Sequence, residues 1–138
     1  MNSPIDIKCL SVNIRGLNKT LKRRSVFRWL HRQNCSFVFL QETYSLKECE
    51  NVWRAEWDGE LFFSHGTNHS KGTMILSNPK IKCNVQKKIC DKNGRYIILD
   101  IAVADTRFVL VNIYAPNDVK QQVAFFKELQ GHLQEFSE

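Results

Sequence analysis

Three short segments constrain the fold most, because each is an apolar run that passes into a polar one. They are Ser11–Asn18, Leu40–Thr43 and Val111–Asn117. An apolar run of this length followed by Gly, Pro or Asn is typical of a β-strand that ends in a loop. In open α/β sheets, ligands bind beyond the carboxyl ends of strands. The segments therefore predict an α/β fold with a polar site where strands end.

The first two segments flank a predicted helix. Residues 5–13 alternate as a strand, residues 20–33 have helical spacing, and residues 36–40 are a largely continuous apolar run, which suits a strand buried on both faces. Strand, helix and strand at this spacing predict a right-handed βαβ unit with parallel strands. The positions expected to face inward from the helix are Leu21, Val26, Phe27 and Leu30.

The remainder of the chain predicts further strands and two helices. A short helix is expected within residues 46–57, and short strands near residues 61–63 and 72–76. A meander follows over residues 85–90, 95–103 and 107–114, with a hairpin turn at Asn93-Gly94. An amphipathic helix comes last, with apolar positions at Val119, Val123, Phe126, Leu129, Leu133 and Phe136. We expect one mixed, largely antiparallel sheet of about six strands, with the helices near 20–33 and 120–136 on its outer face.

Positive charge is concentrated near the N-terminus. Eight basic residues against Asp6 give residues 1–40 a formal charge of +7, whereas the remainder carries −1. Such a local field can attract a polyanion, although a basic helix face can also simply be solvated. The helical spacing puts Arg24, Arg28 and Arg32 on one face. The candidate nucleic-acid contacts are Arg15, Lys22, Arg23, Arg24 and Arg28.

The five cysteines and the absence of long apolar runs bear on location. The count is odd and no Cys-x-x-Cys pair occurs, so neither a disulfide framework nor a zinc site is expected. Cys9 and Cys35 lie in apolar runs and are interpreted as small core residues. We expect a reducing location, nucleus or cytoplasm, and no membrane partner, because no run approaches the ~18 apolar residues of a spanning helix. His65 and His69 are interpreted as residues of a polar loop.

Three polar side chains at strand ends are candidates for chemistry. Glu42 follows a buried strand and could hold Mg²⁺, or it could be an ordinary solvated glutamate. Asn13 could orient a phosphate or a metal-bound water, or only end its strand. Tyr114 could donate a hydrogen bond to a charged phosphate, or pack at a sheet edge. It shares a strand face with Asn112.

In their order and spacing, the three segments resemble the endonuclease/exonuclease/phosphatase superfamily. The chain is most similar to the apurinic-type endonuclease domain of LINE-like retrotransposons. Further short matches are Lys22-Arg23, the Trp53/Trp57 region, Phe62-Phe63-Ser64, Lys71–Leu76, Gly94-Arg95-Tyr96 and Asn117-Asp118. The resemblance implies a four-layer α/β sandwich of two sheets that cleaves DNA phosphodiesters with Mg²⁺, for which Mn²⁺ could substitute. By it, Glu42 is the metal ligand, and Asn13 and Tyr114 are catalytic residues at the phosphate.

The likeness departs from the family in one residue and in extent. Tyr44 stands where relatives often carry His after Glu-Thr. The family's Asp-x-Asn pair, a later Asp and a terminal Asp-His pair are expected beyond Glu138. Residues 1–138 are therefore expected to be one truncated domain, without the second sheet, with an uncovered face that favours self-association.

The function therefore has three open interpretations, and whether the chain alone is an enzyme stays open. The first is a truncated Mg²⁺-dependent DNA endonuclease domain with weak or no activity. The second is a non-catalytic nucleic-acid-binding remnant that uses the basic helix near 19–32. The third is a phosphoesterase of another branch of the superfamily.

Overall fold

The computed structural model describes residues 6–136 and contains three α-helices and seven strands. In chain order they are β1 (Cys9–Asn13), α1 (Thr20–Gln33), β2 (Phe37–Gln41), α2 (Glu50–Glu56), β3 (Leu61–Ser64), β4 (Thr73–Ser77), β5 (Cys83–Cys90), β6 (Tyr96–Val103), β7 (Thr106–Ile113) and α3 (Val119–Gln134). A 3₁₀ turn, η1 (Lys47–Cys49), precedes α2. Ile5, where the first strand was expected to begin, lies outside the described residues.

The strands form two sheets. The first has the order β1-β2-β4-β3, in which β1 and β2 are parallel and the other neighbours antiparallel. The second is the antiparallel meander β5-β6-β7. The predicted βαβ unit and the α/β fold class are confirmed. The prediction of one sheet of about six strands is wrong, and so is the prediction that the chain lacks the second sheet.

The reason for two sheets is that both faces of the first are apolar. Every residue of β3 and β4 is buried. One face packs on α1 and α2 through a core that includes Phe27, Leu30 and Trp53. The other face packs on β6, where Phe37 and Ile75 meet Ile97 and Leu99. A sheet with two apolar faces must be covered on both sides, and a second sheet supplies the second cover.

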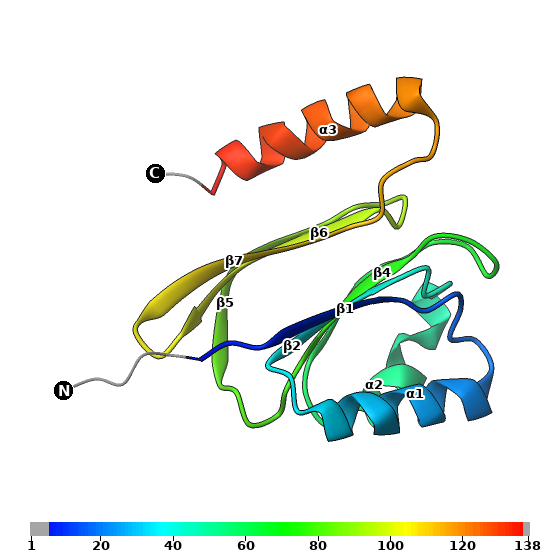
Figure 1. Ribbon diagram of the computed structural model, residues 1–138, viewed down its shortest axis with the longest axis vertical. Helices are drawn as coiled ribbons and strands as arrows, with labels where there is room; N and C mark the ends of the chain where they lie inside the picture. The colour runs from blue at the N-terminus through cyan, green and yellow to red at the C-terminus, as the bar shows by residue number, and fades with distance from the viewer. Residues whose placement is uncertain (1–5, 137–138) are drawn as a thin grey trace.

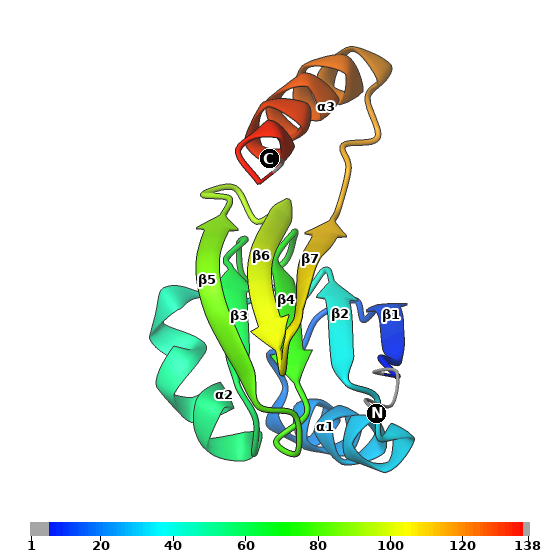
Figure 2. The same ribbon diagram turned by 90° about the vertical axis from the view of Figure 1, so that its left-hand side faces the viewer.

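The four layers run helix, sheet, sheet, helix (Figure 1). The helices α1 and α2 cover the first sheet from outside, and α3 lies across the outer face of the second. In Figure 2 the strands of both sheets run up and down the view, and β6 lies in front of β4. Because the sheets face each other, most of the inner face that we expected to be uncovered is filled by the core between them.

The helices keep their predicted positions but not all of their predicted inner faces. Helix α1 spans the expected residues, yet Leu21 is 82% exposed and Arg23 is buried in its place. In α3, Asp118 caps the N-terminus by accepting from the Lys120 backbone N–H. The residues that pack on the sheet are Phe125, Leu129 and Phe136, whereas Val119, Val123 and Phe126 are exposed. Because Phe125 and Phe126 are adjacent, the helix has two possible apolar faces, and the face that contains Phe125 is the one that packs on the sheet.

All five cysteines are free thiols. Cys35 packs against the first core, as predicted, but Cys9 is exposed because β1 is an edge strand. None of the helices in the described part of the chain is long and apolar enough to cross a membrane.

Candidate active site

Loops from both sheets meet at one end of the sandwich. They follow β1, β2 and β7 and precede β4 and β6, and they surround the same corner on the side where α1 begins (Figure 1). Backbone hydrogen bonds join four of them, from Gly16 N–H to Glu42 O (2.6 Å), Leu17 N–H to Thr43 O (3.0 Å), Tyr44 N–H to Lys71 O (3.0 Å) and Gly72 N–H to Gly94 O (3.1 Å). This corner is therefore fixed by main-chain bonds between segments far apart in the sequence.

The loop after β2 has an unusual backbone. Glu42 and Tyr44 both have positive φ, 54° and 59°, although neither is glycine. A non-glycine residue in this left-handed region costs about 1 kcal/mol or more and persists only where its surroundings hold it. Here the backbone bonds from Gly16 and to Lys71 do so. Such residues cluster at functional sites, so the loop is a candidate for function on its geometry alone.

The structure brings the three predicted site residues together around the Glu42 carboxylate. The Asn13 side-chain amide donates to Glu42 Oε2 at 2.5 Å. The Tyr44 hydroxyl donates to Glu42 Oε1 at 3.4 Å. Tyr114 lies within hydrogen-bonding reach of the same carboxylate, and burial, the negative charge of Glu42 and the hydrogen bond to it together raise the pKa of the Tyr114 hydroxyl. A tyrosine with a raised pKa keeps its proton at neutral pH and can donate it in a hydrogen bond.

Arg95 belongs to this site and was not singled out from the sequence as a functional residue. Its guanidinium lies over the Tyr114 ring, 5.4 Å from the ring centroid, and donates to the Tyr114 carbonyl at 3.1 Å. The Tyr114 N–H in turn donates to the Arg95 carbonyl at 2.7 Å. The available signal was the position of Arg95 directly after the Asn93-Gly94 turn, at the start of a predicted strand next to the one predicted to end at Tyr114.

A buried amide network supports the site from below. Asn112, 2% exposed, donates through Nδ2 to the carbonyls of Leu40 (3.0 Å) and Met74 (2.8 Å). Its Oδ1 accepts from Gln41 Nε2 at 2.8 Å. Asn112 is on β7, whereas Leu40 and Gln41 are on β2 and Met74 is on β4, so this side chain joins the two sheets. The junction lies two residues before Tyr114 on one strand and directly before Glu42 on the other.

A second polar network holds the loop after Glu42. The buried Ser45 hydroxyl lies 2.8 Å from His65 Nδ1, and His65 Nε2 lies 2.6 Å from Glu50 Oε2. The hydrogen bond from His65 lowers the pKa of Glu50. His65 was interpreted as part of a polar loop, and the structure gives it this positioning contact.

The donor set suits a hard cation. Carboxylate and amide oxygens are the ligands that Mg²⁺ takes, and it usually keeps several waters when few carboxylates are available. Glu42 would hold such an ion at this corner, with Asn13 fixing its carboxylate. Within residues 6–136 there is no group of three or more His, Cys, Asp or Glu side chains that could hold a metal.

The predicted nucleic-acid contacts separate into two groups. Arg15 and Lys22 line a cavity of about 330 Å³ beside Tyr44, next to the site. Arg23 is 4% exposed and its guanidinium is bound by Glu56 at 2.5 Å, so it cannot reach a DNA backbone. Arg24 is exposed but lies 3.2 Å from the same carboxylate. Arg28 lines a different hollow with Glu56 and Asp58. It lies six residues along α1 from Lys22, about 9 Å farther from the site.

Comparison with solved structures shows the fold. The chain has the fold of the endonuclease/exonuclease/phosphatase superfamily. It superposes on truncated Caenorhabditis elegans TDP2 with a TM-score of 0.68 at 20% identity, covering 94% of this chain and 55% of that one. For AP endonuclease LMAP from Leishmania major the TM-score is 0.61 at 17% identity, with 80% and 40% covered. For D. rerio TDP2 complexed with single strand DNA product the TM-score is 0.64 at 17% identity, with 94% and 54% covered.

Sequence comparison adds a transposon relative. The chain is 28% identical over 124 residues to the transposon TX1 uncharacterized 149 kDa protein of Xenopus laevis, covering 90% of this chain and 10% of that protein. No protein-family model matches the chain. The chain thus spans about a tenth of the transposon protein and about half of the solved structures. The resemblance to this superfamily and to a transposon-encoded protein, predicted from the sequence, is confirmed.

Proposed function

We propose that this chain is the N-terminal portion of a Mg²⁺-dependent DNA endonuclease domain of a LINE-like retrotransposon, with residues 1–138 as one truncated domain. The observation that carries the proposal is the meeting of Asn13, Glu42 and Tyr114, from three distant segments, at one end of the sandwich. The fold and the transposon relative support a nuclease over a phosphoesterase that acts on lipid or inositol phosphates. DNA as partner, and a reducing location in nucleus or cytoplasm, belong to the same proposal.

Each site residue has a role that its contacts suit. Glu42 binds the metal, which supplies charge neutralisation at the scissile phosphate when bound. Asn13 holds the Glu42 carboxylate in place and presents its amide to a phosphate oxygen. Tyr114 keeps its proton at neutral pH and donates a hydrogen bond to the negative charge of the phosphate. Arg95 holds the Tyr114 backbone and ring.

We expect little or no DNA nicking by this chain alone. The resemblance places the residues that activate water and protonate the leaving group beyond Glu138, and in-line hydrolysis needs both roles. A longer reading frame with an Asp-x-Asn segment and a later Ser-Asp-His should nick supercoiled plasmid with Mg²⁺. It should lose that activity on Glu42→Ala. Robust nicking by residues 1–138, abolished by Glu42→Ala, would overturn the truncation and support the site.

Metal binding tests the site without requiring activity. Mn²⁺ should broaden the NMR signals of the Asn13 side-chain amide and the Tyr114 ring, because both lie beside Glu42. Glu42→Gln should abolish this broadening, whereas Glu48→Gln, at an exposed position of η1, should not. A single carboxylate leaves most ligands to water, so we expect millimolar or weaker Mg²⁺ affinity by calorimetry. Tight binding, or broadening that ignores Glu42→Gln, would refute the assignment.

A non-catalytic nucleic-acid-binding remnant is the second candidate, favoured by the charge of +7 in residues 1–40 and by the exposed Arg24, Arg28 and Arg32. On this alternative, DNA affinity falls steeply with salt, survives Glu42→Ala and is lost when the three arginines become alanine. Affinity that is unchanged in the triple variant would exclude the helix as the binding surface.

A further inference from the structure

The cavity beside Tyr44 is lined differently from the carboxylate site next to it. We call it the Tyr44 cavity, and its volume is about 330 Å³. Its lining is Arg15, Gly16, Asn18, Lys19, Lys22, Tyr44 and Asn68. Three of these side chains are cations, two are amides and one is an aromatic ring, and none is a carboxylate. Cations bind phosphate, amides bind the edge of a base and an aromatic ring stacks on its face. Together they match the chemistry of a nucleotide.

Tyr44 is held in a defined position between the cavity and the metal site. Its ring lies against the backbone of Gly16, where an added Cβ would be 2.6 Å from the ring. Its N–H donates to Lys71 O at 3.0 Å, and its carbonyl accepts from Asn18 Nδ2 at 3.3 Å. Its hydroxyl points to Glu42 Oε1, at 3.4 Å. One side chain therefore borders both Glu42 and the cavity, and adjacent nucleotides of one strand could occupy the two places.

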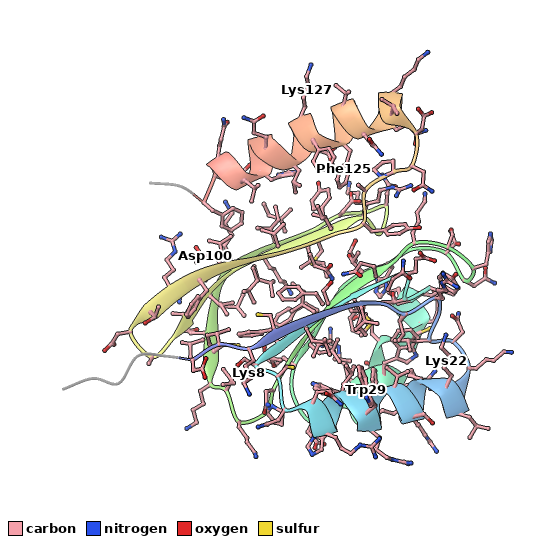
Figure 3. The ribbon with its side chains drawn as sticks, in the orientation of Figure 1. Lys8, Lys22, Trp29, Asp100, Phe125 and Lys127 are labelled. Carbon is pink, nitrogen blue, oxygen red and sulfur yellow. The ribbon has the colours of Figure 1, made fainter. Side chains whose placement is uncertain are left out.

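The basic lining of the cavity is ordered in part. Lys22 Nζ donates to the carbonyls of Ile14 (2.8 Å) and Arg15 (3.1 Å), so its ammonium is fixed against the loop after β1. Lys22 lies at the start of α1, on the same end of the molecule as the site loops (Figure 3). Arg15 and Lys19 are exposed and carry no acidic partner in the cavity lining. These cations are available to a phosphate group.

We propose that Tyr44 stacks on a base of a single DNA strand, in the nucleotide next to the phosphodiester held at Glu42, with the phosphate of that nucleotide against Arg15, Lys19 and Lys22. The inference rests on the proposed function in taking DNA as the ligand. Stacking on a protein ring needs a base whose face is free, so the strand is unpaired at this position. Tyr44 thus makes the chain prefer frayed or single-stranded DNA.

The test uses short single-stranded DNA that carries 2-aminopurine, whose fluorescence falls when the base stacks, in buffer with EDTA. The wild-type chain should quench the fluorescence, and Tyr44→Phe should still quench it. Tyr44→Ala and Tyr44→Leu should lose the quenching and bind the strand roughly five- to a hundredfold more weakly, the range of base–aromatic stacking. Trp29→Ala is the matched control, an exposed aromatic residue of α1 outside the cavity. Lys19→Ala and Lys22→Ala should each lower the salt slope by about one.

Two results would overturn the stacking assignment. One is quenching that persists in both Tyr44→Ala and Tyr44→Leu, and the other is equal affinity for an abasic strand and a strand with bases. Failure to bind any single strand would also overturn it, whatever the metal experiment shows. Because the assay contains EDTA, loss of Mn²⁺ binding at Glu42 and loss of stacking at Tyr44 are separate results. The assignment of the metal site can therefore be refuted while the stacking assignment at Tyr44 is supported, and the reverse is also possible.

Discussion

Asn112 should be costly to replace, because it connects the two sheets from a buried position. In Asn112→Leu the side chain keeps a similar size but loses its donor and its acceptor. The carbonyls of Leu40 and Met74 lose a donor at 3.0 and 2.8 Å, and the Gln41 amide loses an acceptor at 2.8 Å but keeps its bond to the Ser11 hydroxyl. A buried polar group left without a partner costs about 1–3 kcal/mol, and the added apolar contact of leucine offsets part of this. We expect the free energy of unfolding to fall by about 3 kcal/mol.

Urea unfolding followed by circular dichroism measures this change. For an m-value of about 2 kcal/mol/M, a loss of about 3 kcal/mol lowers the midpoint by about 1.5 M. The matched control is Asn84→Leu, on an exposed position of β5, which should change stability by less than about 0.5 kcal/mol. Equal midpoints for the two variants would refute the argument, because the buried amide would then contribute no more than a surface one.

Three further predictions follow from other contacts. Arg23→Ala should lower the free energy of unfolding by about 3 kcal/mol, because it leaves Glu56 without its buried partner, whereas Arg24→Ala should change it little. The hydrogen bond from Arg23 lowers the pKa of Glu56, so the stability that this ion pair contributes is present above the ordinary glutamate pKa and is lost as the pH falls through the lowered pKa. Acid unfolding of the wild type and of Arg23→Ala measures this difference. Burial and Glu128 hold the pKa of Tyr96 far above its usual value, so the contribution of Tyr96 to stability should be constant below about pH 10 and fall as the pH rises further. Tyrosinate absorbance follows this titration, and an unchanged ionisation of Tyr96 in Glu128→Gln would contradict it. Gly16→Ala should destabilise by roughly 1–3 kcal/mol, because φ is +95° and the new methyl group would meet the Tyr44 ring, whereas Gly131→Ala, in a helix with open space around it, should stabilise by roughly 0.5–1 kcal/mol in thermal melts.

Much of the local structure could be predicted, because its signals are local. Helix α1 follows from the spacing of its apolar residues, and the hairpin between β5 and β6 from Asn93-Gly94. The positions of Asn13 and Glu42 at strand ends follow from where the apolar runs stop. Parallel pairing of β1 and β2 then brings Asn13 opposite Gln41, next to Glu42. The approach of these two residues was therefore accessible from the sequence.

What could not be predicted depends on how distant segments pack. The division into two sheets depends on β6 facing β2 and β4, and a continuous apolar strand such as Tyr96–Val103 does not show what covers it. The burial of Arg23 depends on Glu56, which lies 33 residues away. The contact of Arg95 with Tyr114 likewise requires the register of β6 on β7. A sequence pattern shows that a side chain is polar, but not which partner removes it from solvent.

The corner that holds Glu42 and Tyr114 has a thermodynamic consequence, because the two residues belong to different sheets. A ligand that contacts both would be linked to the packing of one sheet on the other, and it would stabilise the folded chain by RT ln(1 + [L]/Kd). The linkage also runs in reverse, since a small separation of the sheets would weaken binding before either sheet lost its own hydrogen bonds. The fraction of chains with ligand bound at this corner therefore depends on how tightly the two sheets are packed together.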